Sequence, residues 1–217
     1  MTTGATEALS KLGDEARGCR ACPLWRKATQ TVFGEGPADA KIVFVGEQPG
    51  DREDIAGRPF VGPAGALFDK ALATAGIDRS KVYVTNAVKH FKNDLRGKRR
   101  LHKRPNVGEV NVCRRWLIGE LDLVAPQLVV ALGATAAMSL AQRPIKVTSS
   151  RGAAFEAARR RVFVTVHPSS LLRLREEEER RVAFEAFVDD LRAAVQLLGQ
   201  PAATHEDVSE RSGAAPS

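Results

Sequence analysis

The chain of 217 residues lacks several features that define whole classes of proteins. Its three cysteines are too few, and odd in number, for a complete disulfide framework, so a reducing compartment is expected. No run of eighteen apolar residues is present, which argues against a membrane-spanning helix. The first residues also lack the basic start and apolar stretch of a secretory signal. These absences favour a cytosolic protein.

The composition that remains is that of one globular unit. Hydrophobic residues make up 43% of the chain, enough to bury one core. We therefore predict a single domain over residues 1–198. Residues 199–217 are rich in alanine, serine, proline and charge without apolar periodicity, and they are predicted to form a disordered tail.

Positive charge is concentrated in one short segment, residues 89–104, with the sequence KHFKNDLRGKRRLHKR. It holds eight lysines and arginines against one acid, a net charge of +7 that equals that of the whole chain. A local anion-binding surface is the favoured interpretation, and Gly97 in its middle suggests a mobile loop. A lysine-rich solubility loop or a localisation signal is the alternative. Two of the four histidines of the chain, His90 and His102, lie inside this segment.

Hydrophobic patterning predicts alternating strands and helices. Four short runs rich in β-branched residues are typical of buried strands: residues 42–45, 82–88, 128–132 and 162–166. Apolar residues recur at helical spacing in the segments between and after them: residues 67–75, 112–124, 133–140 and 176–198. This alternation predicts an α/β fold, a three-layer α/β/α sandwich around a mostly parallel four-stranded sheet.

Polar residues follow the predicted strands at their carboxyl ends, where open α/β sheets bind ligands. Glu47 and Gln48 come after the first strand, Asn86 lies late in the second, and His167 comes after the fourth. We expect these side chains to share one edge of the sheet.

Cysteines at positions 19 and 22 form a CxxC pair that can grip one metal. The pair alone fits a redox dithiol, half of a zinc site or part of an iron–sulfur site. It precedes the first strand, which disfavours a thioredoxin-like role. Cys113 is a candidate third thiolate, with a small core residue as the alternative. His90 is the leading candidate for a fourth ligand, because it lies between the second strand and the helix of Cys113.

Four motifs together resemble one family. They are GEQPGDREDIAGRPFVGPAG (residues 46–65), NAVKHFK (86–92), KRRLH (98–102) and HPSSLLR (167–173). The chain resembles the uracil-DNA glycosylase superfamily, and within it the family-4-like UdgX type. Ordinary family 4 members have alanine where this chain has Gln48, and cysteine where it has His90. Both departures, and the KRRLH loop, point to the UdgX type, with Leu101 in place of isoleucine as a mild difference.

The resemblance implies a 4Fe–4S cluster held by Cys19, Cys22, His90 and Cys113, with a structural role beside the basic loop. Zinc on the same four ligands is the alternative, because three sulfurs and one nitrogen also suit it. The resemblance further implies a monomer in the bacterial cytosol or nucleoid whose partner is uracil-containing DNA, single-stranded or duplex.

Roles in uracil recognition follow from the resemblance. Phe60 is expected to stack on the base, unless it is a core aromatic residue. Asn86 is expected to pair with the uracil edge, unless its amide merely ends the strand. Backbone groups around Gln48 and Asp51 would add contacts. His167 would donate to uracil O2 as negative charge grows there, with a capping histidine as the alternative.

DNA contacts and the reaction itself complete the expectations. Residues expected at the DNA are Lys98, Arg99, Arg100, Ser169, Ser170, Leu171 and Arg173, with Leu171 or Leu172 as a wedge in the base stack. Glu47 would position water or stabilise the cationic sugar, unless it is a structural acceptor of the turn. In UdgX-like proteins the loop histidine, here His102, replaces water and stays bound to the sugar. The rivals are a multiple-turnover glycosylase and a non-catalytic, metal-stabilised nucleic-acid-binding module.

Overall fold

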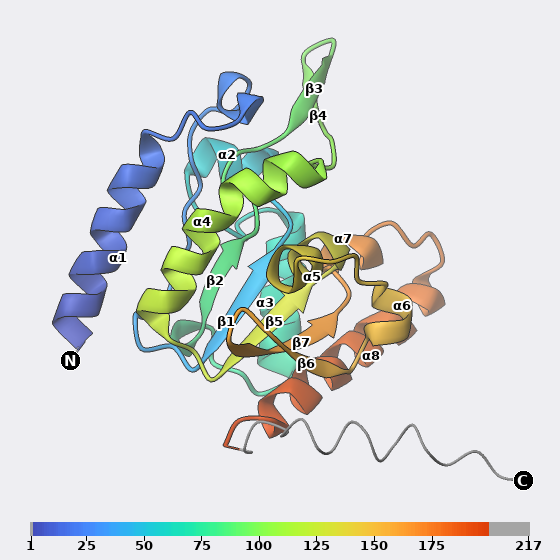
Figure 1. Ribbon diagram of the computed structural model, residues 1–217. Coiled ribbons are helices and arrows are strands. Elements are labelled where there is room, and N and C mark those ends of the chain that lie inside the picture. The colour runs from blue at the N-terminus through green and yellow to red at the C-terminus, as the bar shows by residue number, and fades with distance from the viewer. Residues whose placement is uncertain (1, 200–217) are drawn as a thin grey trace, which may run out of the picture.

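A computed structural model describes residues 2–199 and shows three layers, helices on both faces of one sheet (Figure 1). Apart from residue 199, the tail predicted to be disordered lies outside the described residues. Among residues 2–199, no helix has the length and apolar character needed to cross a membrane. The elements are α1 (Thr2–Arg17), η1 (Pro23–Arg26), β1 (Ile42–Gly46), α2 (Asp51–Ala56), α3 (Pro63–Thr74), η2 (Arg79–Lys81), β2 (Tyr83–Asn86), β3 (Asn93–Arg96), β4 (Arg99–His102), α4 (Val107–Val124), β5 (Leu128–Leu132), α5 (Ala134–Ala141), α6 (Val147–Ser150), β6 (Ala154–Ala157), β7 (Arg160–Thr165), α7 (Pro168–Leu171) and α8 (Glu177–Gln196).

The central sheet has five strands in the order β2-β1-β5-β7-β6. The first four are parallel to their neighbours, as the alternation of strands and helices predicts. The predicted number of four was wrong, because β6 pairs antiparallel to β7 at the edge. The turn between them, Ala158 and Arg159, has both residues at positive φ, 49° and 58°. Such a two-residue turn usually contains glycine or asparagine, so its signal is missing from the sequence.

Alternate residues of each parallel strand face opposite layers, and both layers are apolar. One face of the sheet packs against α4 and α5, with Val43, Val45 and Leu121 in that half of the core. The other face packs against α3 and α8, with Phe44 and Phe68 among its buried residues. Burial on both sides explains why the strands are continuous β-branched runs. The N-terminal helix α1, which no sequence pattern predicted, lies outside α4 and adds Leu9 to the first half (Figure 1).

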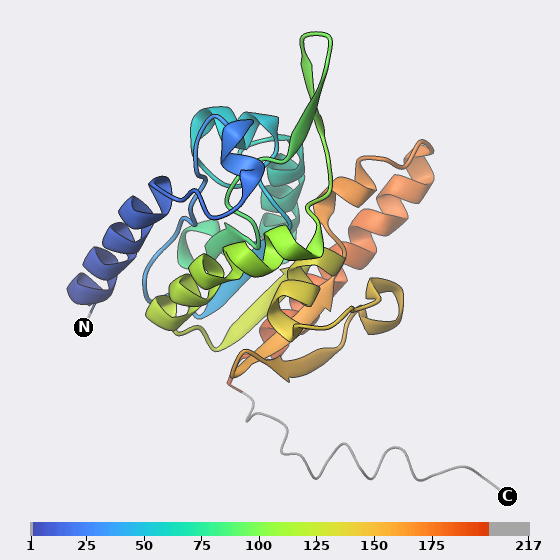
Figure 2. The ribbon, with the colours of Figure 1, turned by 45° about the horizontal axis from the view of Figure 1, so that its top comes forward.

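The segment expected to be a mobile loop is instead a β-hairpin that projects from the body of the protein (Figure 2). β3 and β4 pair antiparallel, with Asn93 opposite His102 and Arg96 opposite Arg99. Gly97 has a φ of 60°, the left-handed conformation that this tight turn requires and that glycine adopts without strain. The hairpin therefore holds its residues in a fixed register, and His102 ends its second strand.

A buried ion pair joins the segment after β2 to α4. Lys89, counted in the basic segment, is 1% exposed and its Nζ lies 2.5 Å from Glu120 Oε2. Lys89 therefore takes no part in an anion-binding surface, which corrects the interpretation of that segment. Glu120 Oε1 also accepts hydrogen bonds from the Gly34 N–H (2.8 Å) and the Tyr83 hydroxyl (3.1 Å), and Thr85 donates to both Glu120 oxygens. The buried Glu120 carboxylate therefore has hydrogen-bond donors for both of its oxygens.

We predict that Lys89→Met destabilises the protein strongly. The substitution leaves the Glu120 carboxylate buried without a countercharge, which typically costs about 3–5 kcal/mol. Urea denaturation of the full chain measures the loss. The double variant Lys89→Met/Glu120→Gln removes both charges and should be more stable than the single variant.

Lys27→Met, which breaks the exposed pair with Asp94, serves as the control and should change stability little. A Lys89→Met protein as stable as the Lys27→Met protein would contradict the importance of the buried pair.

Candidate active site

A cavity of about 460 Å³ opens at the carboxyl end of the parallel strands. Gln48 reaches it from the segment after β1, Asn86 from the end of β2 and His167 from the segment after β7. Phe60, between α2 and α3, and His102, at the end of β4, also line it. The structure thus brings together, in one cavity, side chains from five separate segments that the sequence singled out.

Asn86 presents an amide that the protein leaves without a partner. Its side chain is 3% exposed, and within residues 2–199 no hydrogen bond to the amide is found. A Cβ atom on Gly46 would lie 2.3 Å from Asn86 Oδ1 and 3.0 Å from Phe60 Cζ. Only glycine therefore leaves room for the amide and the ring. The amide lines the cavity, so it can pair with a ligand that has matching donors and acceptors.

Phe60 is held in a strained and rigid position beside this amide. Its φ of 58° is uncommon for a bulky residue and marks stored strain. Its ring packs at 5.1 Å from the Phe68 ring. A Cβ on Gly65 would collide with the Phe60 carbonyl, so α3 lies directly against the Phe60 backbone. Phe60 is thus both a core aromatic and a wall of the cavity.

His167 is a neutral side chain with its proton on Nε2. The backbone N–H of Ser169 donates to His167 Nδ1 at 3.2 Å, so Nδ1 must accept and the ring proton resides on Nε2. Burial lowers the pKa of His167 to about 4, and the nearby His102 and Arg173 act in the same direction. At neutral pH the ring can therefore donate one hydrogen bond without carrying charge.

A larger cavity of about 740 Å³ adjoins the first and contains Glu47. Gln48, His102 and His167 line both cavities, so they stand between them. Glu47 Oε1 lies 3.7 Å from His102 Nε2. The other oxygen, Oε2, accepts a 2.5 Å hydrogen bond from the Thr135 hydroxyl.

Gln48 determines which nitrogen of His102 is unprotonated. The backbone N–H of Lys92 donates to Gln48 Oε1 at 3.0 Å, and Gln48 Nε2 donates to the carbonyl of Lys103 at 2.8 Å. The amide is thereby oriented, and its second N–H lies 2.9 Å from His102 Nε2. His102 Nε2 must accept, so it carries a lone pair and the proton resides on Nδ1. Burial lowers the pKa of His102 below its usual value, with Glu47 opposing, which also favours the neutral ring.

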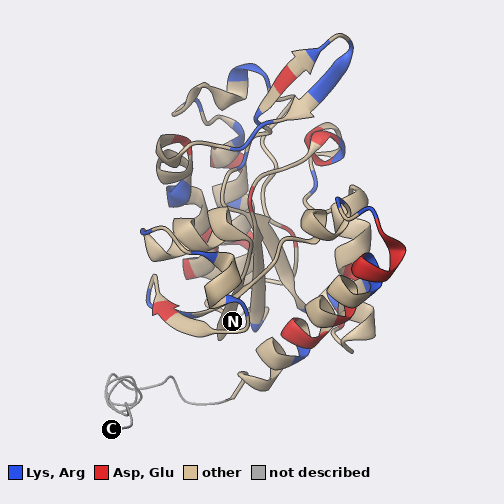
Figure 3. Cartoon of the chain, turned by 90° about the vertical axis from the view of Figure 1, so that its right-hand side faces the viewer, with Lys and Arg blue, Asp and Glu red and all other residues tan. Residues whose placement is uncertain are grey.

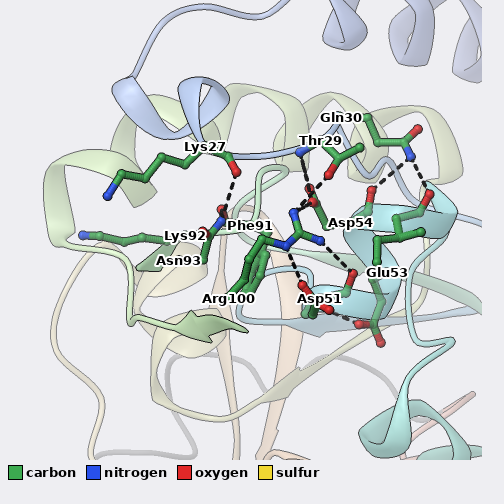
Figure 4. A network of polar contacts seen from close by, with 12 residues as sticks. Lys27, Thr29, Gln30, Asp51, Glu53, Asp54, Phe91, Lys92, Asn93 and Arg100 are labelled. Atoms are coloured by element: carbon green, nitrogen blue, oxygen red, sulfur yellow. Dashed lines mark hydrogen bonds and ion pairs between the residues drawn. The ribbon is translucent and has the colours of Figure 1, made fainter. Parts of the chain in front are cut away.

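Arg100 pins the hairpin to α2 (Figure 4). Its guanidinium contacts Asp51 Oδ1 at 2.6 Å and Asp54 Oδ2 at 2.5 Å, and it donates to Thr29 Oγ1 at 3.0 Å. Asp54 is fully buried and also accepts from the Thr29 N–H. Arg100 is thus engaged within the protein, and its expected contact with DNA stays a prediction. Asp51 lines the smaller cavity while its carboxylate serves this anchor.

Lys98 and Arg99 differ from Arg100 in their surroundings. Both are exposed near the tip of the hairpin, whose ribbon is coloured largely as lysine and arginine (Figure 3). Neither forms an ion pair within the described part of the chain, residues 2–199. Their charges are free for a phosphate backbone.

The segment after His167 corrects one of the expected DNA contacts. Leu171 is 3% exposed and packs in the core, whereas Leu172 is 44% exposed and lines the smaller cavity. Of the two leucines considered as a wedge, only Leu172 is placed for it. Ser169 and Ser170 are used locally, since Ser169 bonds the His167 ring and the Ser170 hydroxyl donates to the His167 carbonyl. Arg173 is exposed and lines both cavities.

The three cysteines share one small apolar cluster with Trp116 and Val88. Two sulfurs accept hydrogen bonds, Cys19 from Trp116 Nε1 at 3.3 Å and Cys113 from the Lys89 N–H at 3.2 Å. Burial raises the pKa of the Cys113 thiol to about 11, so its thiolate requires a nearby cation. Within residues 2–199, however, no three ligating side chains converge closely enough to define a metal site.

His90 has the tautomer that a ligating histidine needs. The Thr31 hydroxyl donates to the Ala16 carbonyl at 3.1 Å, so the 3.0 Å contact between Thr31 Oγ1 and His90 Nε2 must be donated by the imidazole. His90 Nδ1 is therefore left unprotonated, and burial lowers the pKa of the ring. Ligating histidines commonly donate their second nitrogen to such a partner.

Two residues that contact Glu47, Thr135 and Arg104, lie outside the four sequence motifs and were not predicted as site residues. Thr135 is the second residue of α5, and Arg104 follows the hairpin. A threonine at the carboxyl end of the third parallel strand was the available signal, because that edge also carries Glu47 and His167.

Comparison with known proteins gives consistent matches. Residues 33–192 match the family described as the uracil DNA glycosylase superfamily. A type-4 uracil-DNA glycosylase of Thermotoga maritima is 38% identical over 181 residues, which cover 82% of this chain and 91% of the relative. A type-4 enzyme of Archaeoglobus fulgidus is 35% identical over 184 residues, 80% of this chain and 89% of the relative. A type-5 uracil-DNA glycosylase of Pyrobaculum aerophilum is 33% identical over 210 residues, 82% of this chain and 83% of the relative.

The lowered pKa of His167 predicts a loss of stability in mild acid. The pKa is about 4 in the folded protein and 6.5 for an unperturbed histidine, so between these values the unfolded chain binds the extra proton. Above pH 6.5, His167 is neutral in both states and does not change the free energy of unfolding with pH. As the pH falls from 6.5 towards 4, protonation of the unfolded chain lowers the free energy of unfolding. Between about pH 7.5 and about pH 5 the loss is about 2 kcal/mol for one such group.

Urea denaturation at both pH values tests this in the wild type and in His167→Gln. The variant should lose less stability on acidification, with His90 and His102 unchanged in both proteins. An equal loss in the two proteins would show that His167 is not the responsible group.

Proposed function

Because the chain belongs to the uracil-DNA glycosylase superfamily, we propose that it cleaves the N-glycosidic bond of deoxyuridine in DNA. The observation that carries this proposal is the unpartnered Asn86 amide beside the Phe60 ring. The amide offers a donor to uracil O4 and an acceptor to N3–H, whereas cytosine presents the opposite pattern. A uracil turned out of the base stack would lie between this amide and the His167 ring.

His167 acts on the leaving group. As the C1′–N1 bond breaks, its electron pair goes to the uracil ring and negative charge grows on O2. The Nε2–H of the neutral His167 ring donates to this oxygen and stabilises the anion. A histidine whose pKa is about 4 keeps this role throughout the neutral range, without charging the cavity.

We further propose that His102, and not water, captures the sugar. His102 Nε2, on the wall between the two cavities, gives up the hydrogen bond that it accepts from Gln48, and its freed lone pair forms the new bond to C1′ while the uracil anion departs. The product is an imidazolium with its proton still on Nδ1, and the neighbouring Glu47 carboxylate offsets that positive charge. Uracil then takes a proton from solvent. An imidazolium has no easy exit, so each protein molecule acts once.

The type-4 relatives favour the rival, a glycosylase that turns over repeatedly. In that reaction Glu47 orients a water whose oxygen bonds to C1′, and one proton of that water passes to the departing uracil. Three features support the covalent route here: Gln48, His102 on an anchored hairpin, and the neutral imidazole with its lone pair on Nε2. The proposal that the protein only binds nucleic acid has no observation in its favour.

Replacing His102 by alanine separates these reactions. We expect His102→Ala to lose the covalent product and to release uracil repeatedly, because the space left by the imidazole admits water beside Glu47. Uracil-containing single-stranded DNA is incubated with each protein and resolved on a denaturing gel, and free uracil is counted per protein molecule. Asn86→Ala, which removes base recognition but keeps the nucleophile, serves as control and should lose both products.

A shifted band that persists in His102→Ala would exclude His102 as the attacking group. A wild type that releases many uracils per molecule and forms no band would establish the rival.

We also propose that Cys19, Cys22, Cys113 and His90 hold a 4Fe–4S cluster. The support is their chemistry: three sulfurs in one apolar cluster, hydrogen bonds to two of them, and a His90 ring with Nδ1 unprotonated. When bound, the cluster would supply a structural crosslink between the N-terminal segment and α4, and no step of the reaction passes through it.

Iron content tests the cluster. The purified protein should be brown and contain about four irons per chain, as expected for this cluster type. Cys113→Ser should lose iron and unfold at lower temperature, because metal binding is coupled to folding. His90→Cys should keep the iron, since thiolate is the usual ligand. A colourless protein with one zinc per chain would replace the iron–sulfur assignment.

A further inference from the structure

The two oxygens of the Glu47 carboxylate are treated differently by the protein. Oε2 accepts the 2.5 Å hydrogen bond of the Thr135 hydroxyl and lies 3.7 Å from Arg104 Nε. Oε1 faces His102, with 3.7 Å between it and Nε2. One oxygen is therefore fixed from behind, and the other is directed at the wall where the reaction would take place.

Thr135 is built to fix that oxygen. It lies in the first turn of α5, is 1% exposed, and has a β-branched side chain with restricted χ1 rotation. Arg104 Nε donates to the Thr135 oxygen at 3.2 Å, so the single hydroxyl proton is available for Glu47. The three side chains thus form one directed series of hydrogen bonds, from Arg104 to Thr135 to Glu47.

The series also restrains Arg104. Its guanidinium lies near the same carboxylate oxygen, and its side chain is 65% exposed. Thr135 is thus the hydrogen-bond donor that keeps Oε2 in place beside the guanidinium while Oε1 stays directed at His102.

We propose that Thr135, assisted by Arg104, is a positioning residue that aims Glu47 Oε1 at the reacting sugar. This inference rests on the proposed function, because it assigns a task to Glu47 in that reaction. It predicts that the Thr135 hydroxyl influences the rate of bond cleavage without touching the substrate. Misplacing a group by about 1 Å is enough to slow a reaction about 100-fold.

Thr135→Val keeps the shape of the side chain and removes its donor, whereas Thr135→Ser keeps the donor. Single-turnover uracil release is measured with protein in excess over uracil-containing single-stranded DNA, across a series of protein concentrations. We expect Thr135→Val to lower the maximal rate about 10- to 100-fold with little change in the half-saturating concentration. Thr135→Ser should restore the rate to within about threefold of the wild type. Thr74→Val, an exposed threonine at the end of α3, is the matched control and should react as the wild type does.

A double-mutant cycle with Glu47→Ala shows whether the threonine acts through the carboxylate. In the Glu47→Ala background, Thr135→Val should have no further effect on the rate, because there is no carboxylate left to position. An equal slowing in both backgrounds would overturn the proposal, as would a Thr135→Val protein as fast as the wild type. A wild type that releases no uracil would instead refute the proposed function itself, so the two failures are distinguishable.

Discussion

The contact between Lys89 and Glu120 is the constraint from which the geometry of the site follows. Lys89 Nζ also donates to the carbonyl of Asn86 at 2.8 Å, and the Lys89 N–H donates to the Cys113 sulfur. The same carboxylate holds the Gly34 N–H, in the segment that precedes β1. One buried charge pair thus links β2, α4 and the segment before the sheet. Burying two charges is costly unless every partner is in place, so the elements that meet here have little freedom to shift.

Much of the fold was predictable because the parallel strands are buried on both faces. The runs at β1, β5 and β7 are rich in β-branched residues, and the register of the sheet brings their carboxyl ends to one edge. The antiparallel edge was not predictable. The Ala158–Arg159 turn adopts positive φ without glycine, and β6 is half exposed, so neither turn chemistry nor a buried run marks it. Helix α1 was not predicted for a similar reason. Few of its residues are buried, among them Leu9 and Ala16, so the sequence shows no clear apolar periodicity there.

The candidate site was predictable where chemistry is tied to a motif. Asn86, Phe60 and His167 line one cavity as the motifs suggest, although their catalytic roles stay predictions. Contacts between side chains from segments far apart in the sequence could not be predicted. The sequence does not distinguish Arg100, which is anchored, from Arg99, which is exposed, because both lie in one basic run. The sequence also does not show which of the two leucines, Leu171 or Leu172, is exposed. This depends on how the four-residue helix α7 packs on the core.

The anchored hairpin has a consequence for how this loop can change in length. Arg100 and His102 are two positions apart on β4, so their side chains project to the same face of the ribbon. Inserting one residue between them would turn the imidazole to the opposite face while the guanidinium stayed clamped on α2. Residues beside Gly97 at the tip lie outside the stretch between anchor and imidazole, and only Gly97 itself must keep its left-handed conformation. The tip is therefore the place where extra residues, a label or a second binding sequence can be grafted onto this protein, with the distance from anchor to imidazole held constant.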